Sequence, residues 1–281
     1  MNLTRRRLCA SVMLAAWPMM GRAASATLTI GLFPNLPAHR LIELYQPLAN
    51  YLAQQLNCPV RLFSAKDFRS FYEATRNNQF DVVVTAPHLA WLAMVESGWR
   101  PLTTFTRSVT GVVVVRRNSN VIIPSNCRGK VVAMVDPLTI VSQLGLGYFK
   151  SSGLTANVDY RLTNYRNHAD VALAVMLDKA DCGVVGKLPF QQMVVEVSNK
   201  LRVIGETQSE PSQFVMTNPH VSPALFERMR TALIQFNHVP SGVAFIQQQQ
   251  VGAIIVAESK ALTAVAPYAR ATQMQLQRGH E

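Results

Sequence analysis

The sequence predicts an α/β protein of two lobes, each a mostly parallel β-sheet flanked by helices, with a ligand cleft between the lobes. Three observations support this fold class. The chain has 281 residues, about the size at which a single hydrophobic core divides into two. Apolar residues make up 49% and charged residues 15% of the chain, which is typical of compact proteins. Short β-rich runs alternate with longer segments of helical period, as in sheets with helical crossovers.

Residues 1–26 have the pattern of an export signal. Arg5-Arg6-Arg7 precede the apolar run Leu8–Met20, and Ala24-Ser25-Ala26 supplies small residues for cleavage. The apolar run is shorter than the ~20 residues that a spanning helix needs, so we expect cleavage near Ala26 and a soluble monomer in the periplasm. The arginine pair resembles a twin-arginine signal without its usual phenylalanine, and the choice between that route and general secretion stays open.

The first part of lobe 1 is predicted to span residues 27–109. Its first helix is marked by leucines at every fourth position: Leu44, Leu48, Leu52 and Leu56. A continuous apolar run at residues 80–84 is typical of a strand buried on both faces. The remaining elements expected here are strands at 27–33 and 59–63 and helices at 68–76 and 88–96.

Lobe 2 is predicted to span residues 110–206 as an insertion into lobe 1. Its expected strands lie at 112–115, 131–135, 158–162 and 182–185, and its expected helices follow Pro137 and cover 168–178. Residues 207–281 are expected to return to lobe 1, with helices at 223–236 and 244–250.

The charge of the mature chain favours an anionic ligand without naming it. Removal of Arg5, Arg6, Arg7 and Arg22 lowers the formal net charge from +11 to +7 (11 − 4), and a basic protein concentrates anions around itself. The cations are scattered and no nucleic-acid-binding signature is present, so we expect no nucleic-acid partner. The chain also lacks nucleophile-elbow, metalloprotease, P-loop and dinucleotide motifs, and its histidines show no metal-ligand spacing. We therefore expect a protein that is not an enzyme and carries no cofactor or metal.

Three cysteines remain after cleavage: Cys58, Cys127 and Cys182. The favoured interpretation is that all three are small buried apolar residues. The alternative is one disulfide, for which Cys127 and Cys182 are the best candidates because both would flank strands of lobe 2.

Candidate binding residues stand where strands lead into helices, which is where open α/β sheets bind ligands. Four junctions carry such residues: Asp67-Phe68, Thr85 to His88 with Trp91, Asp136 to Thr139 with Ser142, and Tyr165 to His168. Thr139 either holds an anion at a helix start or only caps its own helix. His168 has the same two interpretations. For Phe68 and Trp91 the residues alone favour core packing over a site role.

The order and spacing of these junctions resemble the periplasmic phosphate, phosphite and phosphonate binding proteins of ABC transporters, which have the type II solute-binding fold. The resemblance runs from Thr27 to about Phe236, through Ile30–Pro34, Tyr45–Leu52 and Phe80 to Trp91, then Gly129–Pro137 and His168 to Gly183.

The resemblance implies a role for each candidate. Phe68 and Trp91 would be aromatic walls of the cleft, with His88 beside them, Thr139 and Ser142 would be donors at a helix start, and His168 would be an oxyanion donor. This sequence departs from the family pattern at two places that affect ligand choice. The family's hydroxyl cluster after Asp-Pro is reduced here to Thr139 and Ser142, and Lys187-Leu188 stands where aminophosphonate binders have a carboxylate. The resemblance therefore implies a plain oxyanion rather than an amine-bearing ligand.

Three functions remain open at this stage. The first is delivery of a small oxyanion to a membrane permease. The second is sensing, in which the occupied protein signals to a histidine kinase; an arsenite sensor of this type would use a free thiol. The third, an esterase or phosphatase using Ser142 and His168, lacks an orienting base.

Overall fold

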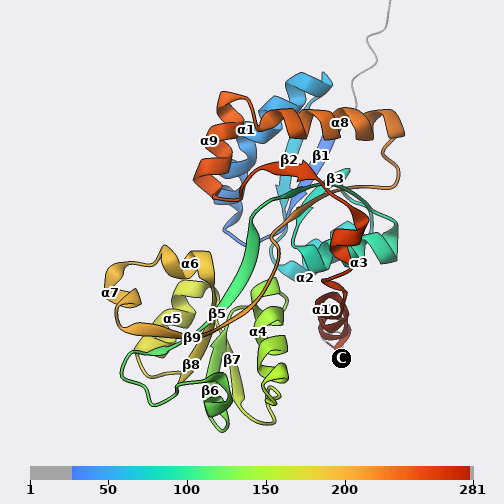
Figure 1. The fold of residues 1–281 in the computed structure, drawn as a ribbon. Coiled ribbons are helices and arrows are strands. Elements are labelled where there is room, and N and C mark those ends of the chain that lie inside the picture. Colours follow the sequence, from blue (N-terminus) through green and yellow to red (C-terminus); the bar gives the residue numbers. More distant parts are fainter. Residues whose placement is uncertain (1–26, 279–281) are drawn as a thin grey trace, which may run out of the picture.

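The computed structural model describes residues 27–278, which form two lobes, each built on its own β-sheet (Figure 1). The predicted export signal therefore lies outside the described residues. The two-lobed α/β class is confirmed, with one correction: each sheet is mixed, because antiparallel strands complete it beside the parallel ones.

The sheet of lobe 1 has six strands in the order β11-β4-β10-β3-β1-β2. β1 pairs in parallel with β2 and β3, whereas β10 is antiparallel to β3 and β4, and β11 is antiparallel to β4. The bounds are β1 (Leu28–Leu32), β2 (Val60–Ser64), β3 (Val82–Thr85), β4 (Arg100–Phe105), β10 (Phe214–Thr217) and β11 (Ile254–Val256).

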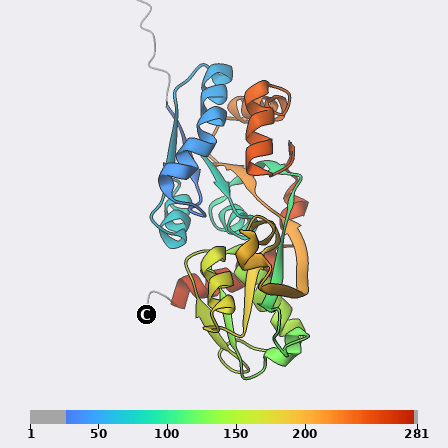
Figure 2. The same ribbon diagram turned by 90° about the vertical axis from the view of Figure 1, so that its left-hand side faces the viewer.

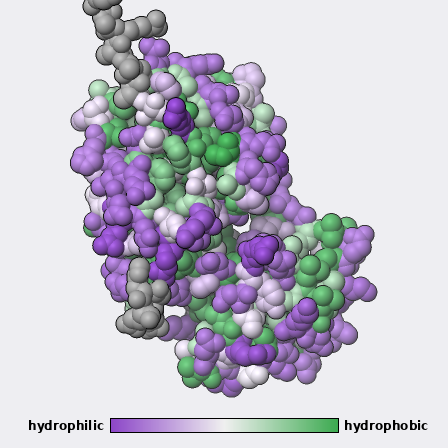
Figure 3. Space-filling model, turned by 180° about the vertical axis from the view of Figure 1, so that it is seen from behind, coloured by the Kyte–Doolittle hydropathy of each residue, from purple (hydrophilic) through white to green (hydrophobic). Residues whose placement is uncertain are grey.

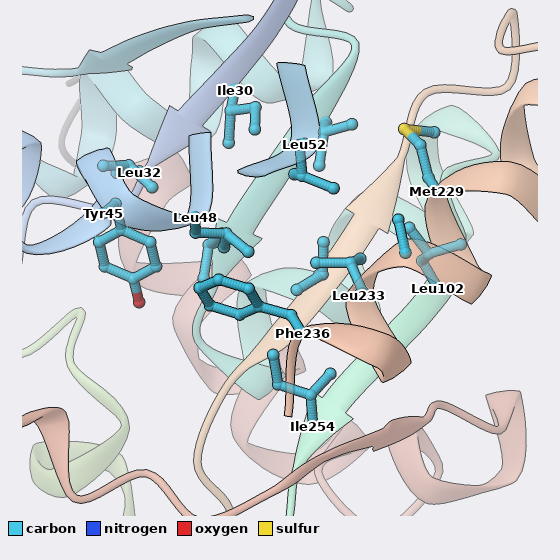
Figure 4. Close-up of a cluster of buried hydrophobic side chains, with 14 of the residues drawn as sticks. Ile30, Leu32, Tyr45, Leu48, Leu52, Leu102, Met229, Leu233, Phe236 and Ile254 are labelled. Carbon is cyan, nitrogen blue, oxygen red and sulfur yellow. The ribbon is translucent and has the colours of Figure 1, made fainter. Parts of the chain in front are cut away.

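Helices cover both faces of this sheet. One face packs against α1 (Ala38–Leu56), α8 (Pro223–Phe236) and α9 (Pro240–Gln249), and the apolar cluster between them is drawn in Figure 4. In that cluster the leucines predicted from their four-residue spacing face Phe236 and the strands. The other face packs against α2 (Phe68–Arg76), α3 (Pro87–Ser97), the 3-10 turn η2 (Ser259–Leu262) and α10 (Ala266–Arg278).

The sheet of lobe 2 has five strands in the order β7-β6-β8-β5-β9. Their bounds are β5 (Ser108–Arg116), β6 (Val131–Met134), β7 (Arg161–Asn164), β8 (Cys182–Gly186) and β9 (Leu201–Pro211). α4 (Ile140–Ser151) covers one face, and α5 (His168–Met176), α6 (Lys187–Gln191) and α7 (Val195–Ser198) cover the other.

The strand predicted at residues 158–162 of this lobe needs a correction. It begins at Arg161 rather than at residue 158, because Thr155 to Tyr160 form a turn. In that turn Asn157 has a φ of 59° and the side chain of Val158 is 81% exposed.

A disulfide joins Cys127, at the end of the 3-10 turn η1 (Pro124–Cys127), to Cys182 at the start of β8. Both residues are fully buried. The favoured interpretation from sequence, three unpaired cysteines, is therefore wrong for these two, and the alternative pairing is the one observed. Cys58 is the free cysteine of the described residues and is partly buried beside the α1 core.

Two short segments carry the chain between the lobes. Residues 106–107 join β4 to β5, and residues 212–213 join β10 to β9, so that the paired strands β5 and β9 extend from the boundary into lobe 2. The predicted lobe boundaries at 110 and 206 fall within these two strands.

The C-terminal helix α10 contacts both lobes, packing on α3 of lobe 1 and α4 of lobe 2 (Figures 1 and 2). Tyr268 packs against apolar clusters of both lobes. The side-chain amide of Gln143 on α4 donates to the Gln275 side-chain oxygen at 3.0 Å. These contacts join the two lobes on the α3 and α4 side.

Candidate ligand-binding cleft

A cleft of about 660 Å³ lies between the lobes and is lined by residues of both. The molecule seen from behind is hollowed where the lobes meet (Figure 3). The lining includes Arg107 to Thr110 and Ser212-Gln213, so the segments that connect the lobes also border the cleft. This is the position expected for a ligand that holds two lobes together.

Lobe 1 supplies an aromatic wall and a polar loop. Phe33 at the end of β1 and Phe68 at the start of α2 both line the cleft, with their ring centroids 6.3 Å apart. Asp67 caps α2 by accepting from the Ser70 N–H at 2.7 Å, which fixes the entry of Phe68 into the helix. The structure thus places Phe68 in the cleft, while its ring also packs on the α2 and α3 core.

The start of α4 brings backbone donors from lobe 2 to the cleft. Thr139 lines the cleft, but its hydroxyl donates to the Asp136 carbonyl at 2.8 Å and accepts from the Ser142 N–H at 3.3 Å. In this structure the Thr139 side chain therefore acts as the helix cap. The N–H groups of Ile140 and Val141, both in the cleft lining, have no partner among the described residues, as is usual for the first turn of a helix.

His168 presents a neutral donor to the same cleft. Its Nδ1 accepts from the Gly186 N–H at 3.3 Å, which leaves the ring proton on Nε2. Burial lowers the pKa of His168 to about 4, because the charged imidazolium would lose its hydration. Above pH 5 the Nε2–H group is therefore a hydrogen-bond donor without a full charge.

The cationic side chains of the cleft differ in how far they are already paired. Lys187 forms an ion pair with Glu206 at 2.8 Å, and Arg40 pairs with Glu43 at 2.5 Å. Arg107 donates to the Gln250 carbonyl at 3.2 Å. Arg166, directly before the cap of α5, lines the cleft and has no hydrogen bond or ion pair to another described residue. Arg166 is thus the least compensated positive charge at the site.

Three of the residues selected from sequence are not part of the cleft lining. His88 is fully buried, and its Nε2–H donates across the lobe boundary to the Leu138 carbonyl at 2.9 Å. Trp91 faces α10, where the Arg270 guanidinium lies 5.8 Å from its ring centroid. The Ser142 hydroxyl is buried and donates to the Val135 carbonyl at 3.1 Å. The roles that sequence reasoning gave these three are corrected to structural ones.

Sequence reasoning selected neither Arg166 nor Arg107 as a site residue. Arg166 stands beside His168 in a junction that the sequence does mark, so its position between strand and helix was an available signal. Arg107 is brought to the cleft by the crossing between the lobes, and nothing in its local sequence indicates that position.

Residues 27–278 contain no group of three or more histidine, cysteine, aspartate or glutamate residues placed to hold a metal ion. Over the same residues, no helix combines the length and apolar character required to cross a membrane.

Solved structures of similar fold include several solute-binding proteins. XAC2383 from Xanthomonas citri, bound to ATP, has a TM-score of 0.78 at 17% identity, over 89% of this chain and 98% of that chain. A binding protein component of an ABC phosphonate transporter from Pseudomonas aeruginosa, PA3383, has a TM-score of 0.74 at 15% identity, over 90% and 87%. PhnD1 from Prochlorococcus marinus, in complex with methylphosphonate, has a TM-score of 0.76 at 12% identity, over 88% and 98%. At these identities the likeness shows a shared fold.

The family assignment comes from a match over most of the sequence. The family model described as the periplasmic substrate-binding protein of phosphonate ABC transporters matches residues 30–262. That range includes both lobes and every junction that lines the cleft. The chain therefore belongs to the family of periplasmic phosphonate-binding proteins of ABC transporters.

Proposed function

We propose that this family member captures a small phosphorus oxyanion between its lobes and delivers it to a membrane permease without changing it chemically. The observation that carries the proposal is the convergence of three kinds of anion donor on one cleft. They are the free N–H groups at the start of α4, the neutral Nε2–H of His168, and the unpaired guanidinium of Arg166.

These donors suit an anion because the α4 N–H groups and the His168 Nε2–H are fixed dipoles, while the Arg166 guanidinium is a positive charge on a flexible side chain. The start of α4 carries a partial positive charge from the helix dipole, which favours anions there. His168 is held in one tautomer by Gly186, so its donor is already oriented before the ligand arrives. Hydrogen bonds to a charged acceptor contribute about 1.5–3 kcal/mol each, so three of them would contribute about 4.5–9 kcal/mol, compared with about −8 kcal/mol for a micromolar affinity.

Closure of the lobes would exclude water from these contacts. Residues 106–107 and 212–213 are the two crossings about which the lobes can rotate, as in other proteins that close on a ligand by a hinge. Rotation would bring Arg166 and α6 toward the loop after β1, which forms the opposite wall. A bound ligand would hold this closed form, which is the form that a permease can distinguish from the empty protein.

We also propose that the protein breaks no bond in its ligand. The Ser142 hydroxyl, which an esterase mechanism would need as its nucleophile, is bonded to a carbonyl and lies outside the cleft lining. The His168 Nδ1 is occupied by a backbone N–H, and no carboxylate is bonded to the ring to orient it as in a nucleophile and base pair. The arsenite-type sensor alternative loses its support, since two thiols form the disulfide and Cys58 is outside the cleft.

We include export in the proposal, with cleavage near Ala26, on the basis of the arginine-rich start and apolar run of the sequence. Mass spectrometry of the protein from a periplasmic extract tests this directly. A chain that starts near Thr27 is expected, and a chain that retains Met1 would contradict it.

The binding proposal is tested by calorimetry on the mature protein with phosphate, phosphite, methylphosphonate and sulfate. At least one phosphorus oxyanion is expected to bind, and Arg166→Ala is expected to weaken that binding about tenfold or more. Lys150→Ala removes an exposed cation from the far end of α4 and serves as the matched control. No binding of any phosphorus oxyanion, or equal losses in the two variants, would reject the proposal.

A further inference from the structure

Before the lobes close, the cleft offers far more room than a bare tetrahedral oxyanion occupies. Its volume of about 660 Å³ lies within the ~300–1,000 Å³ typical of pockets for larger organic ligands. The donors described above occupy only the part formed by α4, Arg166 and His168. The residues that line the rest of the cleft indicate which organic substituent the oxyanion carries.

Much of the remainder is lined by the glutamine half of the cleft, a set of side chains from both lobes: Gln191, Gln192, Gln213, Gln248, Gln249 and Gln250. A glutamine side chain is uncharged and offers two donors and an acceptor. The lining contains a single carboxylate, Asp136, and its Oδ1 already accepts from the Leu138 N–H at 2.7 Å. The glutamine half therefore suits neutral hydrogen-bonding groups better than an amine, which would need a negative partner.

The lobe 1 members of this half are held in place by packing. Gln213 accepts from the Tyr45 hydroxyl at 2.9 Å, and the Tyr45 ring contacts Phe245 on α9 with a centroid distance of 5.4 Å. Gln249 follows Phe245 by four residues, so the two share one face of α9. Gln213 and Gln249 consequently lie on the same side of lobe 1, and Arg107 ties the end of α9 to the crossing by its bond to the Gln250 carbonyl.

Among the described residues of this region, two polar side-chain atoms are buried and have no hydrogen-bond partner. They are the side-chain nitrogen of Gln249 and the hydroxyl oxygen of Ser212, both in residues that line the cleft. A buried donor without an acceptor is unfavourable, and a ligand oxygen placed between the lobes would remove that cost. Closure would add Gln191 and Gln192, since α6 lies below α9 on the same side of the molecule (Figure 1).

We infer that the ligand is an oxyanion joined to an uncharged, hydroxylated organic group, with the oxyanion at α4, Arg166 and His168 and the hydroxyls at the glutamine half. This inference rests on the proposed function, because it uses the same cleft. It assigns Gln249 and Ser212 as specificity-determining residues that contact the substituent and not the oxyanion.

Calorimetry with three probes tests the assignment: methylphosphonate, 2-aminoethylphosphonate and 2,3-dihydroxypropylphosphonate. The dihydroxypropyl compound is expected to bind about tenfold or more tightly than the other two. Gln249→Ala and Ser212→Ala should each weaken that compound about three- to tenfold while leaving methylphosphonate within about twofold. Ser212→Ala removes a hydroxyl without a protein partner, so folding should not suffer, and unchanged melting temperatures verify this for both variants.

Gln247→Ala is the matched control, since Gln247 is an exposed glutamine of α9 outside the cleft lining, and it should change neither affinity. Methylphosphonate or 2-aminoethylphosphonate binding as tightly as the dihydroxypropyl compound would overturn the inference and leave the proposed function standing. The inference would also be overturned, and the proposed function would still stand, if the Gln249 and Ser212 variants bound all probes equally more weakly than the wild-type protein. If no probe binds the wild-type protein, the inference fails, and the proposed function fails with it when phosphate and phosphite do not bind either.

Discussion

Replacement of His168 tests whether this residue binds the ligand as a neutral hydrogen-bond donor or as a cation. His168 lines the cleft with its ring proton on Nε2, and burial lowers the pKa of the ring to about 4. His168→Ala removes one donor to a charged acceptor, which is worth about 1.5–3 kcal/mol and corresponds to a loss of affinity of about ten- to a hundredfold. His168→Gln keeps a neutral donor and should recover part of that loss.

The pH dependence distinguishes the two forms of the donor. Because the pKa is lowered from 6.5 to about 4, His168 stays neutral from pH 8 down to about pH 5.5. The ratio of wild-type affinity to His168→Gln affinity should therefore be constant over that range. Calorimetry with methylphosphonate at several pH values measures this ratio, in which the ionisation of the ligand itself cancels. A ratio that rises tenfold as the pH falls through 6.5 would refute the neutral-donor account, and so would wild-type affinity in His168→Ala.

Three further predictions concern stability. Burial lowers the pKa of His88 from 6.5 to about 4, so the unfolded chain binds the proton more readily between these values. His88 should then contribute a fall of up to about 3 kcal/mol in the free energy of unfolding as the pH drops through this window, and urea titrations at pH 7 and pH 4.5 should show a fall smaller by about that amount in His88→Gln. Thr139→Ala should cost about 1 kcal/mol through loss of the α4 cap, whereas Thr139→Ser should unfold at the wild-type urea midpoint; equal losses would argue against capping. Removal of the Cys127–Cys182 disulfide, which closes a loop with a sequence separation of 55, should lower stability by up to about 4 kcal/mol. An unchanged melting temperature in the double serine variant would contradict a stabilising role.

The parts of the fold that the sequence predicts best are those whose local pattern has one interpretation. The leucine spacing of α1 and the apolar run of β3 each indicate a single element, and both are observed. The sequence does not indicate β9, whose residues follow no regular alternation of buried and exposed positions and include Gly205 and Pro211. That strand forms because it pairs with β5 along the edge of the lobe 2 sheet. Pairing of this kind depends on residues far away in the chain.

The lack of a clear apolar stripe explains the error at Trp91. Buried residues of α3 include Pro87, Leu89, Ala90, Leu92 and Ala93, so apolar side chains occur all around the helix. No stripe then shows which side meets the cleft. The contact of α3 with α10 decides the question, and α10 itself was not predicted because its sequence is largely polar.

The candidate site is predictable only where it stands at a junction between a strand and a helix. Phe68, Thr139, His168 and Lys187 follow that rule and line the cleft. Gln249 and Ser212 come from the end of a helix and from a crossing between lobes, and only the return of the chain to lobe 1 brings them to the cleft. Sequence spacing carries no signal for such positions.

The central claim is that an oxyanion is bound between the lobes by the start of α4, Arg166 and His168. A crystal structure of the mature protein with the tightest-binding phosphorus oxyanion tests it most directly. We predict oxyanion oxygens within hydrogen-bond distance, about 2.7–3.2 Å, of the Ile140 or Val141 N–H and of His168 Nε2, with the Arg166 guanidinium turned toward them. A ligand bound outside this cleft, or bound in it without contact to any of these groups, would contradict the account.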